Sequence, residues 1–312
     1  MLKSDAELEF ILQLYSILES VEGFAAEDRY RFARHLDEHW CACHPSSAAH
    51  SLFLQLIRQS AENGYPPAQF EMYCLNHFWG LFPDSAASKW LKLAAQASHI
   101  PALLTLAEEE YTSPIERRKL LQRAANLGSS EGARELGKLG LKGNLLEGFS
   151  YLLKAEAQGD AESALVLAQL FQDGSAAMVR DDDLAIWYIE RALDLDADEQ
   201  LLPEESKNEA RIKLAKLYLR EAQNDAAAVR AFVLLGDVIA SRISKGAEAE
   251  FMLGCLFRDG RGTSFSAKKA IHFMQTAAEK GHAEAKLELA RLLHPACEPD
   301  SYSSSEKATM SY

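Results

Sequence analysis

The sequence has few of the residues that favour β-strands. It contains 6 Val and 11 Ile among 312 residues, against 48 Ala and 45 Leu. Val and Ile have high strand propensity, whereas Ala and Leu are among the strongest helix formers. Buried parallel strands are rich in Val and Ile, so the composition argues against both a β-rich fold and a parallel α/β sheet. It predicts an all-α chain.

Long hydrophobic runs are also missing. No apolar stretch approaches the roughly 18–20 residues that cross a bilayer, so we expect no membrane insertion. The first residues, MLKSDAELEF, carry acids where a signal peptide has a basic segment. The five cysteines are odd in number and irregularly spaced, which is typical of free thiols in a reducing compartment. We therefore expect a cytoplasmic protein.

Basic charge is scarce, since 33 Lys and Arg face 46 Asp and Glu and leave a net charge of −13. Such a chain repels phosphate backbones, so we expect no nucleic-acid partner. Residues 181–210 hold eleven acids and two bases and carry −9 of this charge. Because Pro203 interrupts helix and like charges repel, residues 194–208 are predicted to form an exposed loop. This loop either solubilises the chain or contacts a basic partner.

A repeat of apolar and small residues runs through most of the chain. Its clearest copy spans 247–290, where apolar residues at steps of three and four mark two amphipathic helices. Glycines fall at the predicted helix ends, and small residues fall where helices must pass closely. With Leu253 as the anchor, the equivalent residues are Met72, Leu106, Leu136, Leu167, Leu214 and Leu289. Their spacings of 30–47 residues indicate a helical solenoid.

These residues resemble the Sel1-like repeat, a branch of the tetratricopeptide-like superfamily that is common in bacteria. The resemblance covers about residues 60–293 and is closest over 247–290 and 130–195. It implies an all-α, right-handed α-α superhelix, a solenoid of about six helix pairs plus a capping helix.

The segments on either side of the repeats match no copy well. Residues 1–59 are expected to form a helical N-terminal cap, with helices near 5–20, 26–43 and 47–61. Residues 294–312 are expected to be a disordered tail, because from Glu298 onward they show no apolar period.

The resemblance also implies a binding groove, because first helices line the concave face in tetratricopeptide-like families. Carrying the offsets of Phe251, Cys255 and Arg258 along the repeats predicts a stripe of mixed apolar and basic residues. The predicted partner-binding residues are Tyr111, Arg134, Lys138, Leu141, Lys216, Phe251, Arg258 and Arg291. Only one acid, Glu108, falls on these offsets, so we expect an acidic or amphipathic protein or peptide partner. Alternatively, these are ordinary solvated positions of irregular helices.

The sharpest catalytic candidate is the string His35-Leu36-Asp37-Glu38-His39. On a helix, His35 and His39 would share one face and could both ligate one metal ion. The spacing also matches the inverted zinc-protease motif, in which Glu38 would activate water. A solvated helix face explains the same string, and no third ligand stands out.

Other catalytic motifs are missing. The Asp259–Ser264 stretch resembles a phosphate loop, but a helix precedes it and the repeat explains both of its glycines. We therefore expect no cofactor and no catalysis. The sequence favours a non-catalytic scaffold or adaptor of the bacterial cytoplasm that binds a protein or peptide through the concave groove. The alternatives are a zinc-dependent hydrolase using His35, Glu38 and His39, and a structural bridge whose convex surface also contacts partners.

Overall fold

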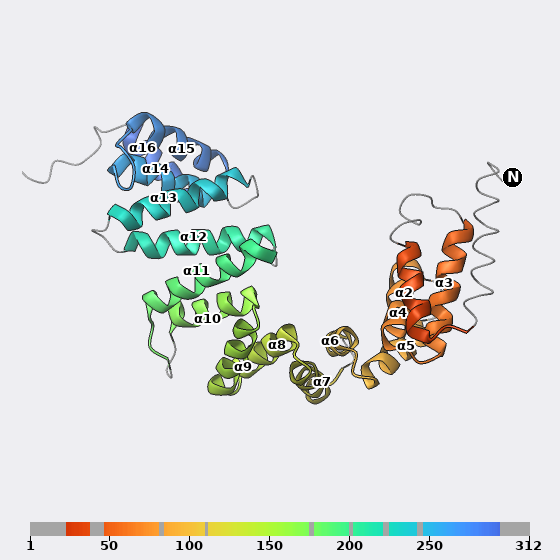
Figure 1. Ribbon diagram of the computed structural model, residues 1–312. Helices are drawn as coiled ribbons and strands as arrows, with labels where there is room; N and C mark the ends of the chain where they lie inside the picture. Colours follow the sequence, from red (N-terminus) through yellow and green to blue (C-terminus); the bar gives the residue numbers. More distant parts are fainter. Residues whose placement is uncertain are drawn as a thin grey trace, which may run out of the picture. The chain divides into compact units, whose positions relative to one another are not determined.

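The computed structural model describes residues 23–37, 47–80, 84–109, 112–174, 178–199, 202–220, 225–241 and 246–293. These residues form 15 α-helices and no strand, which confirms the predicted all-α class (Figure 1). None of the helices in this part of the chain is long and apolar enough to cross a membrane. The chain divides into two compact units, unit 1 (Met1–Ala155) and unit 2 (Glu156–Tyr312), and each is described by itself.

Unit 1 begins with α2 (Ala26–Leu36) and α3 (Ser47–Glu62). It continues with α4 (Pro66–Trp79), α5 (Asp84–Gln96), α6 (Ile100–Glu108), α7 (Pro114–Asn126), α8 (Ser130–Leu141) and α9 (Leu145–Ala157), near whose end the division falls. Unit 2 contains α10 (Ala161–Asp173), α11 (Asp182–Glu199), α12 (Glu204–Arg220), α13 (Asp225–Ala240), α14 (Gly246–Asp259), α15 (Ala267–Glu279) and α16 (Ala283–Leu293).

The repeat anchors show how these helices pair. Every anchor from Met72 to Leu289 lies in an even-numbered helix. Up to Leu293, where the described residues end, an odd-numbered helix follows each of these helices before α16. The first helices are therefore α4, α6, α8, α10, α12 and α14, with α5, α7, α9, α11, α13 and α15 as their second helices. The predicted solenoid of helix pairs is confirmed, and the described residues place α16 after the sixth pair.

The turns that lead from a second helix into α8 and into α10 share one form. Gly128 and Gly159 adopt positive φ angles of 95° and 89°, which an L side chain disfavours. The next residue, Ser129 or Asp160, then caps the following helix by accepting a hydrogen bond from the backbone N–H of Gly132 or Ser163. A glycine followed by a capping residue thus sets where α8 and α10 start.

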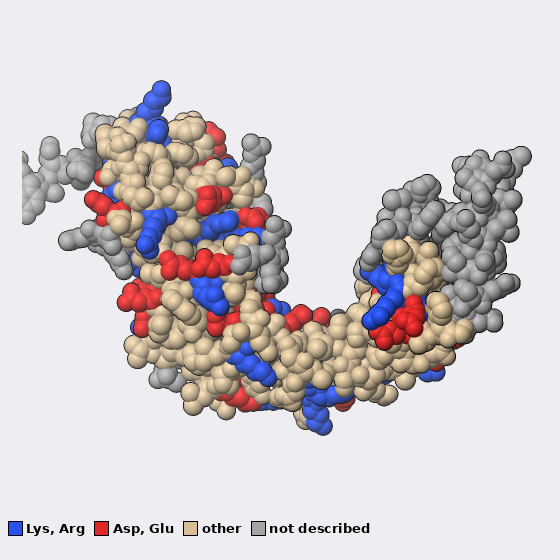
Figure 2. Space-filling view, viewed as in Figure 1, with Lys and Arg blue, Asp and Glu red and all other residues tan. Residues whose placement is uncertain are grey.

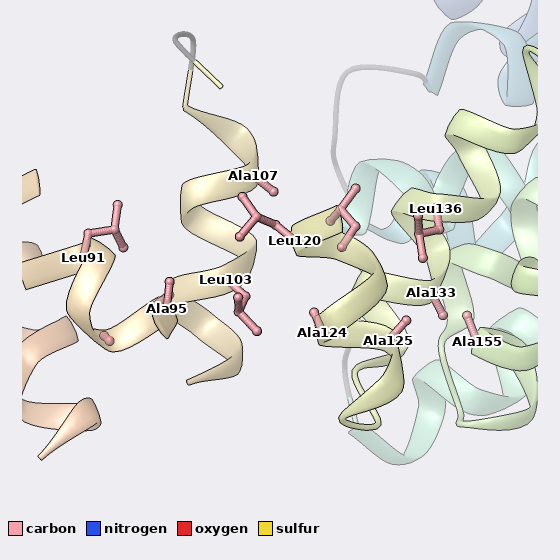
Figure 3. Packing of buried hydrophobic residues seen from close by; sticks show 13 residues of the cluster. Leu91, Ala95, Leu103, Ala107, Leu120, Ala124, Ala125, Ala133, Leu136 and Ala155 are labelled. Atoms are coloured by element: carbon pink, nitrogen blue, oxygen red, sulfur yellow. The ribbon is translucent and has the colours of Figure 1, made fainter. Parts of the chain in front are cut away.

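Alanine and leucine fill the core of unit 1 between successive pairs. One cluster extends from α5 to α9, and its almost fully buried members include Leu91, Leu103, Leu121, Ala125 and Ala133. Figure 3 shows leucine side chains lying between helices whose alanines allow close approach. In unit 2, ring pairs replace part of this packing, since Phe171 stacks on Tyr188 with centroids 5.6 Å apart.

The acidic segment is not the exposed loop that the sequence predicts. Helix α11 runs through Glu199 and α12 begins at Glu204, so most of residues 194–208 are helical. Asp196 is buried, pairs with Lys207 Nζ at 2.8 Å and accepts a hydrogen bond from the Leu202 N–H at 2.6 Å. Pro203 lies directly before α12, where its missing N–H leaves no helical bond unmade. The density of acidic residues suggested an exposed loop, but the Asp196 carboxylate is buried because Lys207 pairs with it.

The ends of the chain are only partly described. Helix α2 lies within the predicted helix near 26–43, and α3 agrees with the predicted helix near 47–61 but ends at Glu62. The residues between Asp37 and Ser47 lie outside the described part. The predicted helix near 5–20 and the predicted tail 294–312 also lie outside it. The boundary at residue 59 between cap and solenoid stays a prediction.

Candidate protein-interaction surface

In unit 1, the first helices α6 and α8 border a hollow of about 460 Å³. One side is lined by Ile100, Pro101, Leu104, Thr105 and Glu108 of α6, and the other by Gly128, Ser129, Ser130 and Glu131 at the start of α8. Leu104 and Glu108 have the repeat offsets of Phe251 and Cys255. The hollow therefore lies on the first-helix face that the sequence nominates. Its apolar wall and acidic rim could hold an apolar side chain beside a basic one.

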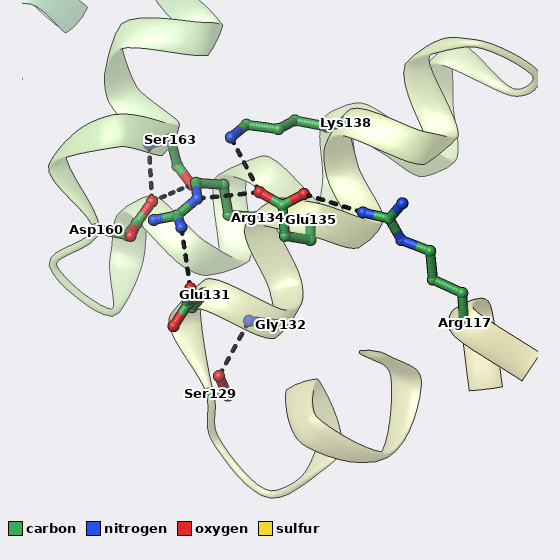
Figure 4. Close-up of polar contacts among 9 residues, drawn as sticks. All are labelled: Arg117, Ser129, Glu131, Gly132, Arg134, Glu135, Lys138, Asp160 and Ser163. Carbon is green, nitrogen blue, oxygen red and sulfur yellow. Dashed lines mark hydrogen bonds and ion pairs between the residues drawn. The ribbon is translucent and has the colours of Figure 1, made fainter. Parts of the chain in front are cut away.

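The two predicted cations of α8 meet one carboxylate. Lys138 Nζ lies 3.0 Å from Glu135 Oε1, and Arg134 lies 3.5 Å from both Glu131 and Glu135. Arg117 of α7 approaches the same Glu135 at 3.9 Å (Figure 4). The Arg134 side chain is only 15% exposed. The structure thus brings Arg134 and Lys138 together, as part of an internal ion-pair network.

Unit 2 contains a second network of the same kind. Arg258 of α14 and Arg291 of α16 both pair with Glu288, at 2.8 Å and 2.6 Å. The bidentate hydrogen bonds of Arg258 to Asp259, with further charge from Glu288, raise the pKa of its guanidinium. These contacts hold Arg258 charged and oriented along the first-helix face.

The other unit 2 candidates also have internal partners. Lys216 of α12 pairs with Glu248 of α14 at 2.5 Å. The Phe251 ring stacks on His282 with centroids 4.6 Å apart. Figure 2 shows basic and acidic side chains next to each other on the visible face of each unit.

The acids in these networks are the residues that sequence reasoning missed. The offsets carried along the repeats sample only three positions per helix, and neither Glu135 nor Glu288 is one of them. A signal was present, because Glu135 and Lys138 in one copy align with Glu288 and Arg291 in another when Leu136 is matched to Leu289. A carboxylate three residues before a base on a helix forms such a pair.

Two predicted partner-binding residues remain, Leu141 and Tyr111. Leu141 is the last residue of α8 and is half-buried. Tyr111 lies outside the described residues.

A second hollow in unit 1 lies on second helices and can be compared with the first. It measures about 450 Å³ and lies mainly between the second helices α5 and α7. Its wall includes Lys92, Gln96, Glu116 and Leu120. Arg123 crosses this region and donates hydrogen bonds to the carbonyl oxygens of Ala95 and Gln96, which cap the end of α5. Arg123 thus joins α7 to the end of α5, and we explain this hollow as part of the packing of the two helices.

The predicted zinc string is only partly visible. His35 is exposed on the last turn of α2, whereas Glu38 and His39 lie outside the described residues. Among the residues that the structure describes, no three His, Cys, Asp or Glu side chains are placed to hold a metal ion.

The two described cysteines, Cys74 and Cys255, carry free thiols. Burial raises the pKa of both, and the charge of Glu71 raises that of Cys74 further. A raised pKa keeps the thiol protonated at neutral pH, so neither side chain is an activated nucleophile.

Comparisons with known proteins agree with this geometry. The Sel1 repeat family matches residues 118–129, 131–160, 161–196 and 247–282. The comparison with curated proteins gave no match.

Two solved structures share the fold. One is a protective antigen present in uropathogenic Escherichia coli strains that displays the Sel1-like repeat (SLR) fold, with a TM-score of 0.67 and 18% identity. The alignment covers 94% of this chain but 60% of the antigen, so the chain spans less than two thirds of that protein's length. The other is a Sel1 repeat protein from Oxalobacter formigenes, with a TM-score of 0.55, 18% identity and coverage of 93% and 92%. The chain thus carries matches to the Sel1 repeat at four stretches, and its fold is the one that these two solved structures display.

Proposed function

We propose that this chain is a non-catalytic scaffold or adaptor that binds a protein or peptide segment on its first helices. The observation that carries the proposal is the hollow between α6 and α8, which lies on the face that the repeat offsets nominate. Solenoids leave such faces free because each repeat buries only the surfaces it shares with its neighbours. In unit 1 the proposed surface includes Arg134, Lys138, Leu141 and Tyr111. In unit 2 it includes Lys216, Phe251, Arg258 and Arg291.

The charge pattern favours an amphipathic segment over a purely acidic one. Lys138, Arg258 and Arg291 each have a carboxylate within 3.0 Å. An acidic partner would have to displace that carboxylate, and exchanging one exposed ion pair for another gains little, about 0–1 kcal/mol. Glu108 and Glu131 are exposed at the rim of the hollow. A segment with one apolar side chain for the hollow and a basic residue for this rim fits best.

Free thiols at Cys74 and Cys255 support the cytoplasm as the proposed location, because a reducing compartment keeps such thiols unpaired. The scaffold proposed here needs no metal ion and no cofactor.

The experiment fills one hollow at a time. Thr105→Trp places a large side chain in the α6/α8 hollow, and Gln96→Trp does the same in the α5/α7 hollow of nearly equal volume. The tagged chain first captures its partner from the native host, and calorimetry then measures the affinity of both variants for that partner.

Thr105→Trp should weaken binding at least tenfold, because a filled hollow excludes the anchoring side chain. Gln96→Trp should leave the affinity unchanged, and both variants should keep the helical circular dichroism of the parent. Equal affinity of the two variants and the parent would contradict the proposal, as would a loss confined to Gln96→Trp.

A further inference from the structure

Helix α16 repeats the positions by which α14 packs on its second helix, yet on α16 these positions are open. The positions on α14 are Glu250, Leu253, Gly254 and Phe257, and all four are buried. Thirty-six residues later, at the anchor spacing, come Lys286, Leu289, Ala290 and Leu293. Three of them are exposed, Leu293 to 53%, and Leu289 is half-buried. Figure 1 shows α16 at the end of the described helix stack of unit 2.

The α14/α15 pair shows what such a face binds. A Cβ atom at Gly254 would lie 2.8 Å from Met274 Cγ, so α15 approaches α14 closely there. The rings of Phe257 and Phe273 stack nearly parallel, with centroids 5.6 Å apart. The face α14 presents therefore takes an amphipathic helix with small residues and one aromatic ring.

An ion pair lies at the edge of the α14/α15 interface. Lys280, just after α15, donates a hydrogen bond to the buried Glu250 Oε1 at 2.7 Å. At the equivalent position α16 carries Lys286, so the charge is reversed. A helix that completes this pair must therefore bring an acid to the place where α15 brings Lys280.

The open face forms a continuous stripe. Lys286, Leu289 or Ala290, and Leu293 follow the helical spacing of i, i+3 or i+4, and i+7, so they lie along one side of α16. Ala285 is the one residue of α16 that is buried. Leu287 and Arg291 point away from Leu289 and Leu293, and Arg291 pairs with Glu288. The stripe is thus separate from the first-helix face of the proposed scaffold function.

We propose that the stripe Lys286, Leu289, Ala290 and Leu293 binds an amphipathic helix of a partner protein, packed on α16 as α15 packs on α14. The partner helix carries small residues and an aromatic ring along its apolar face. It places a carboxylate against Lys286. Charge complementarity at Lys286, together with continuation of the α14/α15 interface pattern, identifies this occupant.

The test uses two peptides derived from α15. Both span residues 266–280 and carry a fluorescent label. The basic peptide keeps Lys280, and the acidic peptide carries the substitution Lys280→Glu. Because they differ at one residue, the cost of forming the isolated helix is nearly equal in both. Fluorescence anisotropy against the full chain should show that the acidic peptide binds at least fivefold more tightly than the basic peptide.

Variants of the chain complete the test. Lys286→Glu should reverse the preference between the two peptides. Leu293→Asp should weaken binding of the acidic peptide at least tenfold, whereas Leu287→Asp, at a side chain that is 63% exposed and points away from Leu289 and Leu293, should change it less than about threefold. Both leucines are exposed, so the helical circular dichroism should be preserved in each variant.

Several results would overturn the proposal. These are equal affinity for the two peptides, no binding of the acidic peptide, or an unchanged preference in Lys286→Glu. A dimer that Leu293→Asp converts to a monomer in sedimentation would instead assign the stripe to a second copy of the chain. Displacement of the probe by a peptide of residues 294–312 would assign it to the chain itself.

Discussion

The helix pairs α8/α9 and α12/α13 reach the same arrangement by different means. In α8/α9, Gly140 and Gly148 bring the two backbones together, since a Cβ at Gly148 would lie 2.5 Å from the Leu141 nitrogen. In α12/α13, a Cβ at Gly236 would meet no atom within 4 Å, and buried Ala215 and Ala231 take part in the packing instead. The Sel1 repeat match covers α8 and α9 but no residue of α12 or α13. A helix pair in this solenoid thus requires small side chains at the contact, and glycine is needed only where backbones meet.

The two pairs also differ in how the chain enters them. Before α8, the residues Gly128 and Ser129 form the recurrent turn and cap. Before α12, the buried Asp196 pairs with Lys207 and receives the Leu202 N–H. The entry to α12 is therefore held by a polar contact, whereas the entry to α8 is set by a glycine turn.

The largest effect is expected from removing that polar contact. Asp196→Ala leaves the Lys207 ammonium, whose side chain is 14% exposed, without its closest partner. We expect the free energy of unfolding to fall by about 3 kcal/mol in urea denaturation. The double variant Asp196→Ala, Lys207→Met should recover part of this loss, and a loss no smaller than that of the single variant would contradict the ion-pair explanation.

The same contact predicts a pH dependence. Burial raises the pKa of Asp196, but the hydrogen bonds from Lys207 and the Leu202 N–H outweigh it and leave the pKa below its ordinary value. The stabilisation is therefore complete above the unfolded pKa of about 3.9 and is lost as pH falls through the folded value. Urea denaturation at pH 7 and near pH 3 should show the difference between parent and Asp196→Asn shrinking at acid pH. A difference that stays constant would contradict this.

An intermediate effect is expected in the glycine-based pair. Gly148→Ala forces a methyl group against backbone atoms of Leu141 and Gly140, which a side-chain rotation cannot relieve. We expect destabilisation of about 1–3 kcal/mol from overpacking, measured by urea denaturation. Gly143→Ala, where nothing lies within 4 Å, is the matched control and should change stability far less.

The smallest effect should have the opposite sign. Gly236→Ala in α13 meets no atom within 4 Å and lies inside a helix. Alanine should therefore stabilise the protein by about 0.5–1 kcal/mol through higher helix propensity. A thermal melt would show this gain, and destabilisation would mean that α13 packs more closely against its neighbours at this position.

Much of the fold could be predicted from the sequence because it rests on local spacing. The anchors Leu136 and Leu253 mark first helices by apolar periodicity, and Gly128 marks a turn by its backbone freedom. Asp196 could not be predicted as buried, because its partner Lys207 lies on the next helix and only the fold brings them together. The pairing of Lys138 with Glu135 was visible as a three-residue spacing, but the hollow beside it depends on how α6 meets α8.

The central claim is that partners bind the first-helix face, and site-specific photo-crosslinking tests it most directly. A photoreactive amino acid is placed at Thr105 or at Gln96, one in each of the two hollows of unit 1, and the chain is expressed in its native host. We predict that irradiation gives a discrete crosslinked protein from position 105 and none from position 96. A crosslinked partner from position 96 alone would contradict the account and place binding on the second helices.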